Sequence, residues 1–308
     1  MNFRDLAASL RIPVVSAPML LVSGPKLVIE AGKSGILGAF PALNARTTDQ
    51  LKNWLEEIQG TLAGRPYAVN LIIQGPGAPR FVDDLALIEA VKPPVVITSV
   101  GDPAKAVERI HAFGGLVFHD VATVRHAQKA IAAGVDGLIL LTAGAGGHTG
   151  TANPFAFVAQ VRAFWDGPML LAGAIADGNG IAAARALGAD LVYMGTRFAA
   201  SEESLAPAPY KALLVSETMA DVILTDRISG LPATILRGSI VRAGLDPDAL
   251  PERLELFKPN LPEGIKAWRD IWSGGHGVGS IIDVPPVAEI VDRLAAEFEA
   301  AKARFRAI

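Results

Sequence analysis

The sequence predicts a (β/α)8 TIM barrel of the α/β class with a smaller inserted cap domain. Short apolar runs alternate with longer segments that carry helical start and stop signals. Strands that are apolar on both faces and alternate with helices are typical of a parallel sheet, and eight such units favour closure into a barrel. An open doubly wound sheet is the alternative, but the residues after the first run, Ala17 to Leu21, lack its nucleotide-binding glycine fingerprint.

The eight predicted strands share the short apolar composition of buried strands. They are Pro13 to Ala17, Ile36 to Ala39, Tyr67 to Leu71, Val95 to Thr98, Leu116 to His119, Gly137 to Leu141, Met169 to Ala172 and Leu191 to Met194. Several segments between them have Thr, Asp or Pro at their starts and glycine after their ends, which are the usual start and stop signals of helices. These predicted helices are Thr48 to Gln59, Pro103 to Ala112, Thr123 to Ala133, Phe155 to Phe164 and Asn179 to Leu187.

The alternating pattern ends after Phe198. The segment from Ser201 to Gly275 is richer in proline and charge and contains two helix-like pieces, Tyr210 to Ala220 and Gly264 to Ile271. It shows no clear strands. We therefore expect an insertion that lies beside the mouth of the barrel.

Three ranges describe the expected domain organisation. Residues 1–200 form the barrel, residues 201–276 form a substrate-side cap domain, and residues 277–308 complete the barrel. The tail from Val287 to Phe305 has the apolar spacing of an amphipathic helix, so we expect it to pack back on the outside of the barrel.

Composition narrows the classes of function. The formal net charge is -3, from 28 basic and 31 acidic residues with no dense basic cluster, which argues against a nucleic-acid partner. The chain has no cysteine, and its five histidines are dispersed, so no catalytic metal is expected. The start, Met1 to Asp5, lacks the order of a secretion signal, and no apolar run approaches the ~18 residues of a membrane span. We expect a cytoplasmic protein without membrane contact.

The segment after the sixth predicted strand is the strongest functional signal. An apolar run leads directly into Gly144-Ala145-Gly146-Gly147-His148, so glycines present a single imidazole. Glycine permits close backbone approach to a ligand, and histidine exchanges protons near neutral pH. A structural turn with an incidental histidine is the competing interpretation.

Other polar residues and glycines also cluster at strand ends, where barrel active sites lie. They are Pro18 and Met19 after strand one, Asn70 after three, Thr98 after four, His119 and Asp120 after five, Gly173 after seven, and Gly195 and Thr196 after eight. Glycines after the last two strands favour a phosphate site. The strand period leaves open whether His119 faces the interior. A second Gly-Gly-His sequence ends at His276, where the insertion returns to the barrel.

The chain resembles the nitronate monooxygenase family, formerly the 2-nitropropane dioxygenases, which is related to flavin-dependent enoyl-acyl-carrier-protein reductases. Six segments carry the resemblance: Ile12 to Met19, Val69-Asn70, Val124 to Ala127, Ala145 to Gly150, Ala172 to Gly178 and Met194 to Phe198. The specific part of the resemblance is the Gly-Gly-His-x-Gly loop followed in order by the Ala-Asp-Gly and Met-Gly-Thr segments.

The resemblance implies a barrel that holds FMN without a covalent bond. It implies isoalloxazine contacts from Ala17, Pro18 and Met19; flavin or phosphate contacts from Asn70; a cofactor-side position for Asp120; backbone contacts from Gly146 and Gly147; and phosphate contacts from Gly173, Gly195 and Thr196. His148 would be catalytic, and His276 would lie on the substrate side. Asp120 stands where some relatives have lysine, and Ser273-Gly274-Gly275-His276-Gly277 departs from a Ser-Ala-Gly-Gln-Gly loop, so specificity is open.

The implied activity is oxidation of an alkyl nitronate, or of a nitroalkane, with O2 to a carbonyl compound and nitrite. The alternative is an NAD(P)H-dependent flavin reductase that acts on an enoyl thioester or a quinone. A flavin-binding subunit without turnover is a third class. The oligomeric state is open, with a homodimer as one option.

Overall fold

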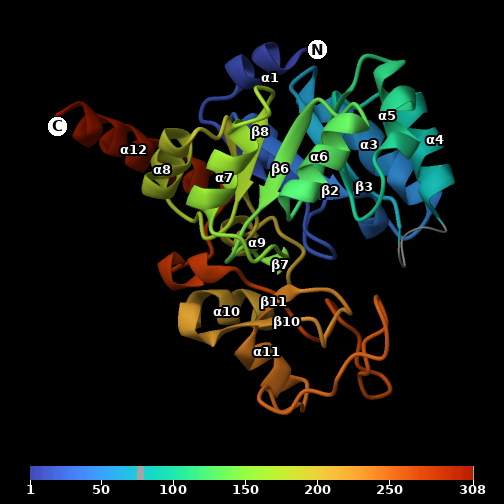
Figure 1. Cartoon of the computed structure of the whole chain (residues 1–308), viewed down its shortest axis with the longest axis vertical. Helices are drawn as coiled ribbons and strands as arrows, with labels where there is room; N and C mark the ends of the chain where they lie inside the picture. The colour runs from blue at the N-terminus through green and yellow to red at the C-terminus, as the bar shows by residue number, and fades with distance from the viewer. Residues whose placement is uncertain (75–79, 308) are drawn as a thin grey trace.

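The computed structural model describes residues 1–74 and 80–307, and its centre is a closed parallel barrel (Figure 1). The strand order around the barrel is β1-β2-β3-β4-β5-β6-β8-β9, and each barrel pairing is parallel. The strands are β1 (Val14–Ser16), β2 (Leu37–Pro41), β3 (Tyr67–Ile72), β4 (Val95–Ser99), β5 (Leu116–Val121), β6 (Gly137–Leu141), β8 (Met169–Ala172) and β9 (Leu191–Met194). The predicted barrel and its eight strands are confirmed.

Side chains on these strands alternate between two apolar layers. One layer fills the barrel interior with residues such as Val15, Ile97 and Phe118. The other lies between strands and helices and includes Val96 and Val117. Because successive strand residues point to opposite faces, this alternation decides which polar residues at the strand ends face the interior.

Helices surround the barrel. They are α1 (Phe3–Ser9), α2 (Pro25–Lys33), α3 (Thr48–Leu62), α4 (Phe81–Val91), α5 (Ala104–His111), α6 (Val124–Ala132), α7 (Pro154–Arg162), α8 (Gly178–Leu187), the short α9 (Thr196–Ala199) and α12 (Val287–Arg306). The five helices predicted between the strands are present with small shifts at their ends, and so is the tail helix, α12. Sequence analysis did not propose α1, α2 and α4.

The segment after α9 lies on one side of the barrel, next to β7 (Gly147–His148) (Figure 1). It contains α10 (Ala208–Ser216), α11 (Arg237–Arg242) and the strands β10 (Val222–Thr225) and β11 (Ala233–Leu236). These strands and β7 form an antiparallel sheet in the order β10-β11-β7. The expectation that the insertion has no clear strands was therefore wrong.

A second expectation for the insertion was also wrong. Gly264 to Ile271 forms turns and one isolated bridge, from Ala267 to Ile271, in place of a helix. Its apolar residues Ile265, Trp268 and Ile271 pack with the core around Ile235, so their spacing reflects the packing of an irregular loop. Within the described residues, no helix is both long and apolar enough to cross a membrane.

Helix α12 packs against α8 at a position that excludes side chains. A Cβ added to Gly178 would lie 2.3 Å from the backbone nitrogen of Phe298 and 2.4 Å from Cβ of Glu297. The Gly178 N–H donates a hydrogen bond to Oε2 of Glu297 at 2.8 Å. The glycine thus lets the last helix approach the barrel and hold its outer layer.

We predict that Gly178→Ala lowers the free energy of unfolding by about 1 to 3 kcal/mol, because backbone atoms must move to admit the methyl group. Gly60→Ala is the matched control, since an added Cβ at this position in α3 meets nothing within 4 Å. Replacing that helical glycine should stabilise the protein by about 0.5 to 1 kcal/mol. Urea denaturation of both variants measures the difference, and equal stabilities would contradict the packing argument.

Candidate active site

The strand alternation places three polar side chains inside the barrel near its carboxyl end. Asn70, Asp120 and Tyr193 each lie two residues beyond an interior apolar residue of the same strand. His119 precedes Asp120 on β5, so its side chain points to the opposite face of the sheet. Its Nδ1 is 2.8 Å from the hydroxyl oxygen of Thr98, and burial lowers its pKa to about 4. His119 therefore belongs to the layer between strands and helices.

Asn70 is fixed by two hydrogen bonds across the neighbouring strand. Its Nδ2 donates to the carbonyl oxygen of Ile97 at 3.0 Å and to the hydroxyl of Ser99 at 2.9 Å. Both amide hydrogens are thereby used, so the Oδ1 atom remains as the group that can accept a hydrogen bond from a ligand.

Asp120 has an unsatisfied polar atom at the mouth of the barrel. Its Oδ1 is buried and has no hydrogen-bond partner among the described residues. Burial raises the pKa of this carboxyl to about 7. Burial also raises the pKa of Tyr193, and the nearby charge on Asp120 raises it further. A carboxyl in this state can donate a hydrogen bond at neutral pH, which an ionised carboxylate cannot.

The loop after β1 is held in place by Asn44, which sequence analysis missed. Asn44 Nδ2 donates to the carbonyl of Met19 at 2.9 Å, and its Oδ1 accepts from the N–H of Leu21 at 2.7 Å. The N–H of Ala17 pairs with the carbonyl of Met194 at 2.9 Å. These bonds place Ala17, Pro18 and Met19 beside the end of β9. The signal for Asn44 was an amide just beyond the second strand.

The return loop, residues 272–277, lies against the loop after β6. The N–H of His276 donates to the carbonyl of Gly144 at 2.9 Å, and the N–H of Gly147 donates to the hydroxyl of Ser273 at 2.5 Å. The N–H of Gly275 donates to Oγ1 of Thr196 at 3.0 Å. The structure thus brings Gly146, Gly147, Thr196 and His276 together from segments far apart in the sequence.

Glycine is required where these segments meet. A Cβ on Gly275 would lie 2.5 Å from the Gly144 carbonyl oxygen, and one on Gly146 would lie 2.8 Å from Oγ1 of Thr196. Gly173 has a φ of 138°, and its added Cβ would lie 2.2 Å from Oγ1 of Thr142. At Gly195 the nearest atom, Sδ of Met19, is 3.5 Å away. Gly195 alone of these four has room for a side chain.

His148 is held by two side chains of the insertion that sequence analysis missed. Its Nε2 is 3.2 Å from the hydroxyl oxygen of Ser229, and its ring packs edge to face on Trp268 with centroids 5.1 Å apart. Burial lowers the pKa of His148 to about 4. No sequence spacing signals these partners, because the pairing of β7 with β11 alone brings Ser229 and His148 together.

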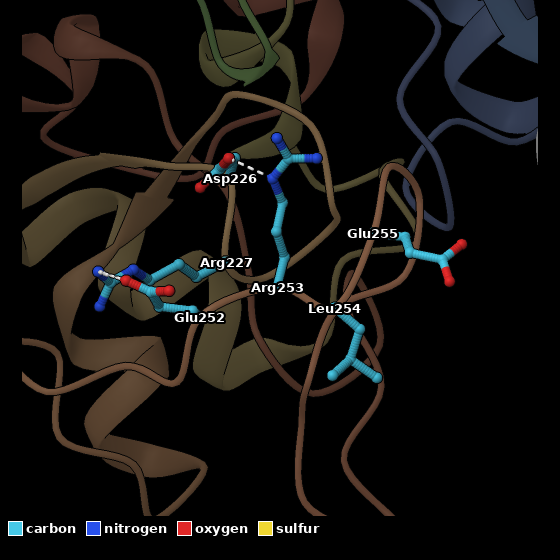
Figure 2. A pocket seen from close by; sticks show the side chains of 6 residues that line it. All are labelled: Asp226, Arg227, Glu252, Arg253, Leu254 and Glu255. Atoms are coloured by element: carbon cyan, nitrogen blue, oxygen red, sulfur yellow. Dashed lines mark ion pairs between the residues drawn. The ribbon is translucent and has the colours of Figure 1, made fainter.

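A cavity of about 370 Å³ lies within the insertion itself (Figure 2). It is lined by Asp226, Arg227, Glu252, Arg253, Leu254 and Glu255. Four of its charged groups pair with one another, Arg253 with Asp226 at 2.6 Å and Arg227 with Glu252 at 3.7 Å. It contains none of the predicted site residues, so the barrel mouth remains the candidate site. In the part of the chain that the structure describes, no three His, Asp or Glu residues cluster as metal ligands.

Similarity to known proteins identifies the family of this chain. The nitronate monooxygenase family model matches residues 5–297. The chain belongs to this family. A nitronate monooxygenase of Paraburkholderia phytofirmans is 27% identical, with 93% of this chain and 92% of the relative aligned. The structure of a nitroalkane oxidase from Streptomyces ansochromogenes superposes with a TM-score of 0.82 at 26% identity, covering 97% of this chain and 99% of that one.

This chain also has sequence relatives that are named for a different activity. An octahydro-1H-indene-4-carboxyl-CoA dehydrogenase of Rhodococcus jostii is 30% identical over 75% of this chain. The aligned part spans 64% of the length of that dehydrogenase.

We predict that Asp120→Asn stabilises the ligand-free protein at pH 7 to 8, because the amide removes a buried carboxyl whose folded-state pKa is raised. A raised folded-state pKa means that stability falls as pH rises from about 4 to about 7. The difference in free energy of unfolding between the variant and the wild type should therefore shrink toward zero as the pH is lowered to about 4. Urea denaturation between pH 4 and 8 measures it, and a pH-independent difference would contradict the burial of Asp120.

Proposed function

We propose that the chain is an oxidoreductase that binds FMN at the carboxyl end of its barrel and oxidises alkyl nitronates with O2 to carbonyl compounds and nitrite. The observation that carries this proposal is the convergence of the loops after β6, β8 and β9 with the return loop. Gly275 lies so close to the backbone of the loop after β6 that only glycine fits there. The loops after β8 and β9 join through hydrogen bonds from the N–H of Ala174 to the Gly144 carbonyl and from the N–H of Gly275 to Thr196. Family membership supports the same reaction.

The residues at the last two strands fit a phosphate group. Gly195 and Thr196 open the short helix α9, whose first N–H groups have no partner within the helix. Thr196 Oγ1 already accepts a hydrogen bond from Gly275, so its own proton is available to a phosphate oxygen. Gly173 would add backbone contact from the neighbouring strand. No acidic side chain among the predicted phosphate contacts opposes an anion.

The interior polar groups fit an aromatic ring with hydrogen-bonding edges. The buried Oδ1 of Asp120 lacks a partner, and Oδ1 of Asn70 is free to accept. Ala17, Pro18 and Met19 would contact the ring through the backbone of the loop that Asn44 holds. A buried carboxyl without a hydrogen-bond partner destabilises the fold, so a cofactor that pairs with it would offset that penalty.

Bound FMN would supply the two-electron redox chemistry of the reaction. His148 would act on the substrate. Its lowered pKa keeps the imidazole neutral at pH 7, so one ring nitrogen accepts a hydrogen bond and the other donates. A base with a pKa of about 4 removes a proton from carbon slowly, which favours a preformed nitronate as the better substrate and a neutral nitroalkane as the slower one.

Residues 201–276 would form a cap that sets the size of the substrate. The phosphate contacts proposed above come from barrel loops, whereas Ser229 and Trp268 of this segment contact the imidazole of His148. His276 packs on Gly144 at the edge of the same loop, so we propose that it lines the substrate side.

A second candidate is an NAD(P)H-dependent flavin reductase that acts on an enoyl thioester or a quinone. The thioester in the name of the Rhodococcus relative favours it. In that reaction His148 would donate a hydrogen bond or a proton to the reduced substrate. Which of the two reduces the bound flavin, a nitronate or NAD(P)H, separates the candidates.

We predict that Gly195→Asp weakens FMN binding about ten-fold or more, because a carboxylate repels the phosphate, yet leaves riboflavin binding nearly unchanged. Gly195→Asn is the matched control, since it has the same size without the charge. An added Cβ at Gly195 makes only ordinary van der Waals contacts, the nearest at 3.5 Å. Fluorescence titration of flavin-free protein with FMN and riboflavin measures both affinities. Equal FMN affinity in the two variants would show that the phosphate does not lie next to Gly195.

We predict that His148→Ala slows flavin bleaching by a neutral nitroalkane about 10² to 10⁴-fold, the usual effect of losing an acid-base group. Bleaching by the preformed nitronate should slow much less, because no proton has to leave carbon. Anaerobic stopped-flow absorbance of the FMN-loaded protein measures both rates. Equal slowing would leave His148 only an orienting role, and bleaching of the wild type by NADH or NADPH but not by a nitronate would favour the reductase.

A further inference from the structure

The hydroxyl of Ser229 lies between His148 and a backbone carbonyl. Ser229 comes from the turn between β10 and β11, and its Oγ is 3.2 Å from Nε2 of His148. The same hydroxyl donates to the carbonyl oxygen of Leu231 at 3.0 Å. Ser229 therefore has contacts on both sides that constrain where its single proton lies.

Counting protons assigns the tautomer. The Leu231 carbonyl accepts the Ser229 proton at 3.0 Å, the shortest of the three contacts of this hydroxyl. The Ser229 oxygen lies 3.4 Å from the backbone nitrogen of Leu231 and 3.2 Å from Nε2, so it is left to accept from both. A neutral imidazole carries one N–H, and it must then be at Nε2. The other ring nitrogen, Nδ1, makes no hydrogen bond to a side chain or backbone group of the described residues, so it keeps its lone pair.

Trp268 limits reorientation of the ring. Its side chain meets the imidazole at an interplanar angle of 87°, and its own backbone has a φ of 68°, a left-handed conformation that is costly for a tryptophan. A hydrogen bond from its N–H to the carbonyl of Ile271 at 3.0 Å holds that conformation. The insertion thus fixes the ring by packing and its tautomer by hydrogen bonding.

We propose that Ser229 is a positioning residue that holds His148 as the Nε2–H tautomer and so presents Nδ1 as the acceptor toward the substrate. The part that concerns substrate rests on the proposed function of His148. The part that concerns the tautomer depends only on the contacts of Ser229.

The tautomer is tested by long-range ¹H–¹⁵N correlation spectra of histidine-labelled FMN-loaded protein at pH 7, with His148 assigned by its loss in His148→Gln. The wild type should show a protonated Nε2 and an unprotonated Nδ1. Ser229→Ala should populate the other tautomer, and Ser229→Thr, which keeps the hydroxyl, should restore the wild-type pattern. A protonated Nδ1 in the wild type, or an unchanged pattern in Ser229→Ala, would overturn the proposal.

Ser273→Ala is the matched control. Ser273 accepts from the backbone of Gly147, next to His148, but does not touch the imidazole. It should keep the wild-type tautomer. A shift as large as that in Ser229→Ala would overturn the proposal, because loosening of β7 would then explain both results.

A kinetic measurement separates this proposal from the proposed function. Ser229→Ala should lower kcat for a neutral nitroalkane roughly ten- to hundred-fold, the range for losing the partner that orients a functional histidine. Ser229→Thr should recover most of the rate. If the wild type oxidises neither nitroalkane nor nitronate, the proposed function fails, and the spectra still decide the tautomer. A normal rate in Ser229→Ala despite a changed tautomer would overturn the role of Nδ1.

Discussion

The loop after β6 and the return loop share a backbone-to-backbone contact on which the rest of the candidate site depends. At Gly275 an added Cβ would fall 2.5 Å from one backbone oxygen and 2.8 Å from a backbone nitrogen of the facing loop. No side chain can occupy that gap. The contact fixes the position of the loop after β6, which leads to His148. The N–H of Gly275 also donates to the hydroxyl of Thr196 and so orients it at the start of α9.

Burial has the same effect on the ionisable groups near the mouth of the barrel. It lowers the pKa of His148 to about 4 and raises that of Asp120 to about 7. Both shifts favour the neutral form, which is the expected response to a region of low polarity. Below about pH 7 a neutral imidazole and a neutral carboxyl each offer one donor and one acceptor, so the site then presents directed hydrogen bonds with little net charge. Such an arrangement suits a flat polar ring and a small anion held beside it.

Sequence predicted the barrel well because its signal is local. Each strand is a short apolar run, and the strand ends mark the mouth, where Asn70 of β3 and Asp120 of β5 lie. His148 lies beyond the end of β6, on the two-residue strand β7. The sequence could not show whether the side chain of His119 points into the barrel or toward the helices, because this depends on the register of β5 with its neighbouring strands. The two-residue strand β7 is too short to give any periodic signal.

The insertion was predicted poorly for a related reason. The β-branched runs at β10 and β11 did carry a strand signal, separated by a turn that contains glycine, but they follow a segment whose proline and charge content favoured loops. Gly264 to Ile271 has apolar residues at helical spacing that instead cover the core around Ile235. Ser229 and Trp268 lie about 80 and 120 positions from His148 and meet it only in the fold. The pairing of β7 with β11 brings the turn that carries Ser229 to His148, and Trp268 packs on the core around Ile235.

The sheet that joins β7 to β11 also restricts how the molecule can move. His148 pairs with Ala233, and Gly147 pairs with Thr234, so the strand that carries the imidazole is an edge of the sheet of the insertion. A hinge rotation of the insertion away from the barrel would either break this pairing or pull His148 along. Substrate exchange is therefore better served by motion of side chains and of irregular loops than by opening of the whole insertion. For protein engineering, the same pairing means that an insertion exchanged between relatives has to match the register of β7, so the two parts are not interchangeable modules.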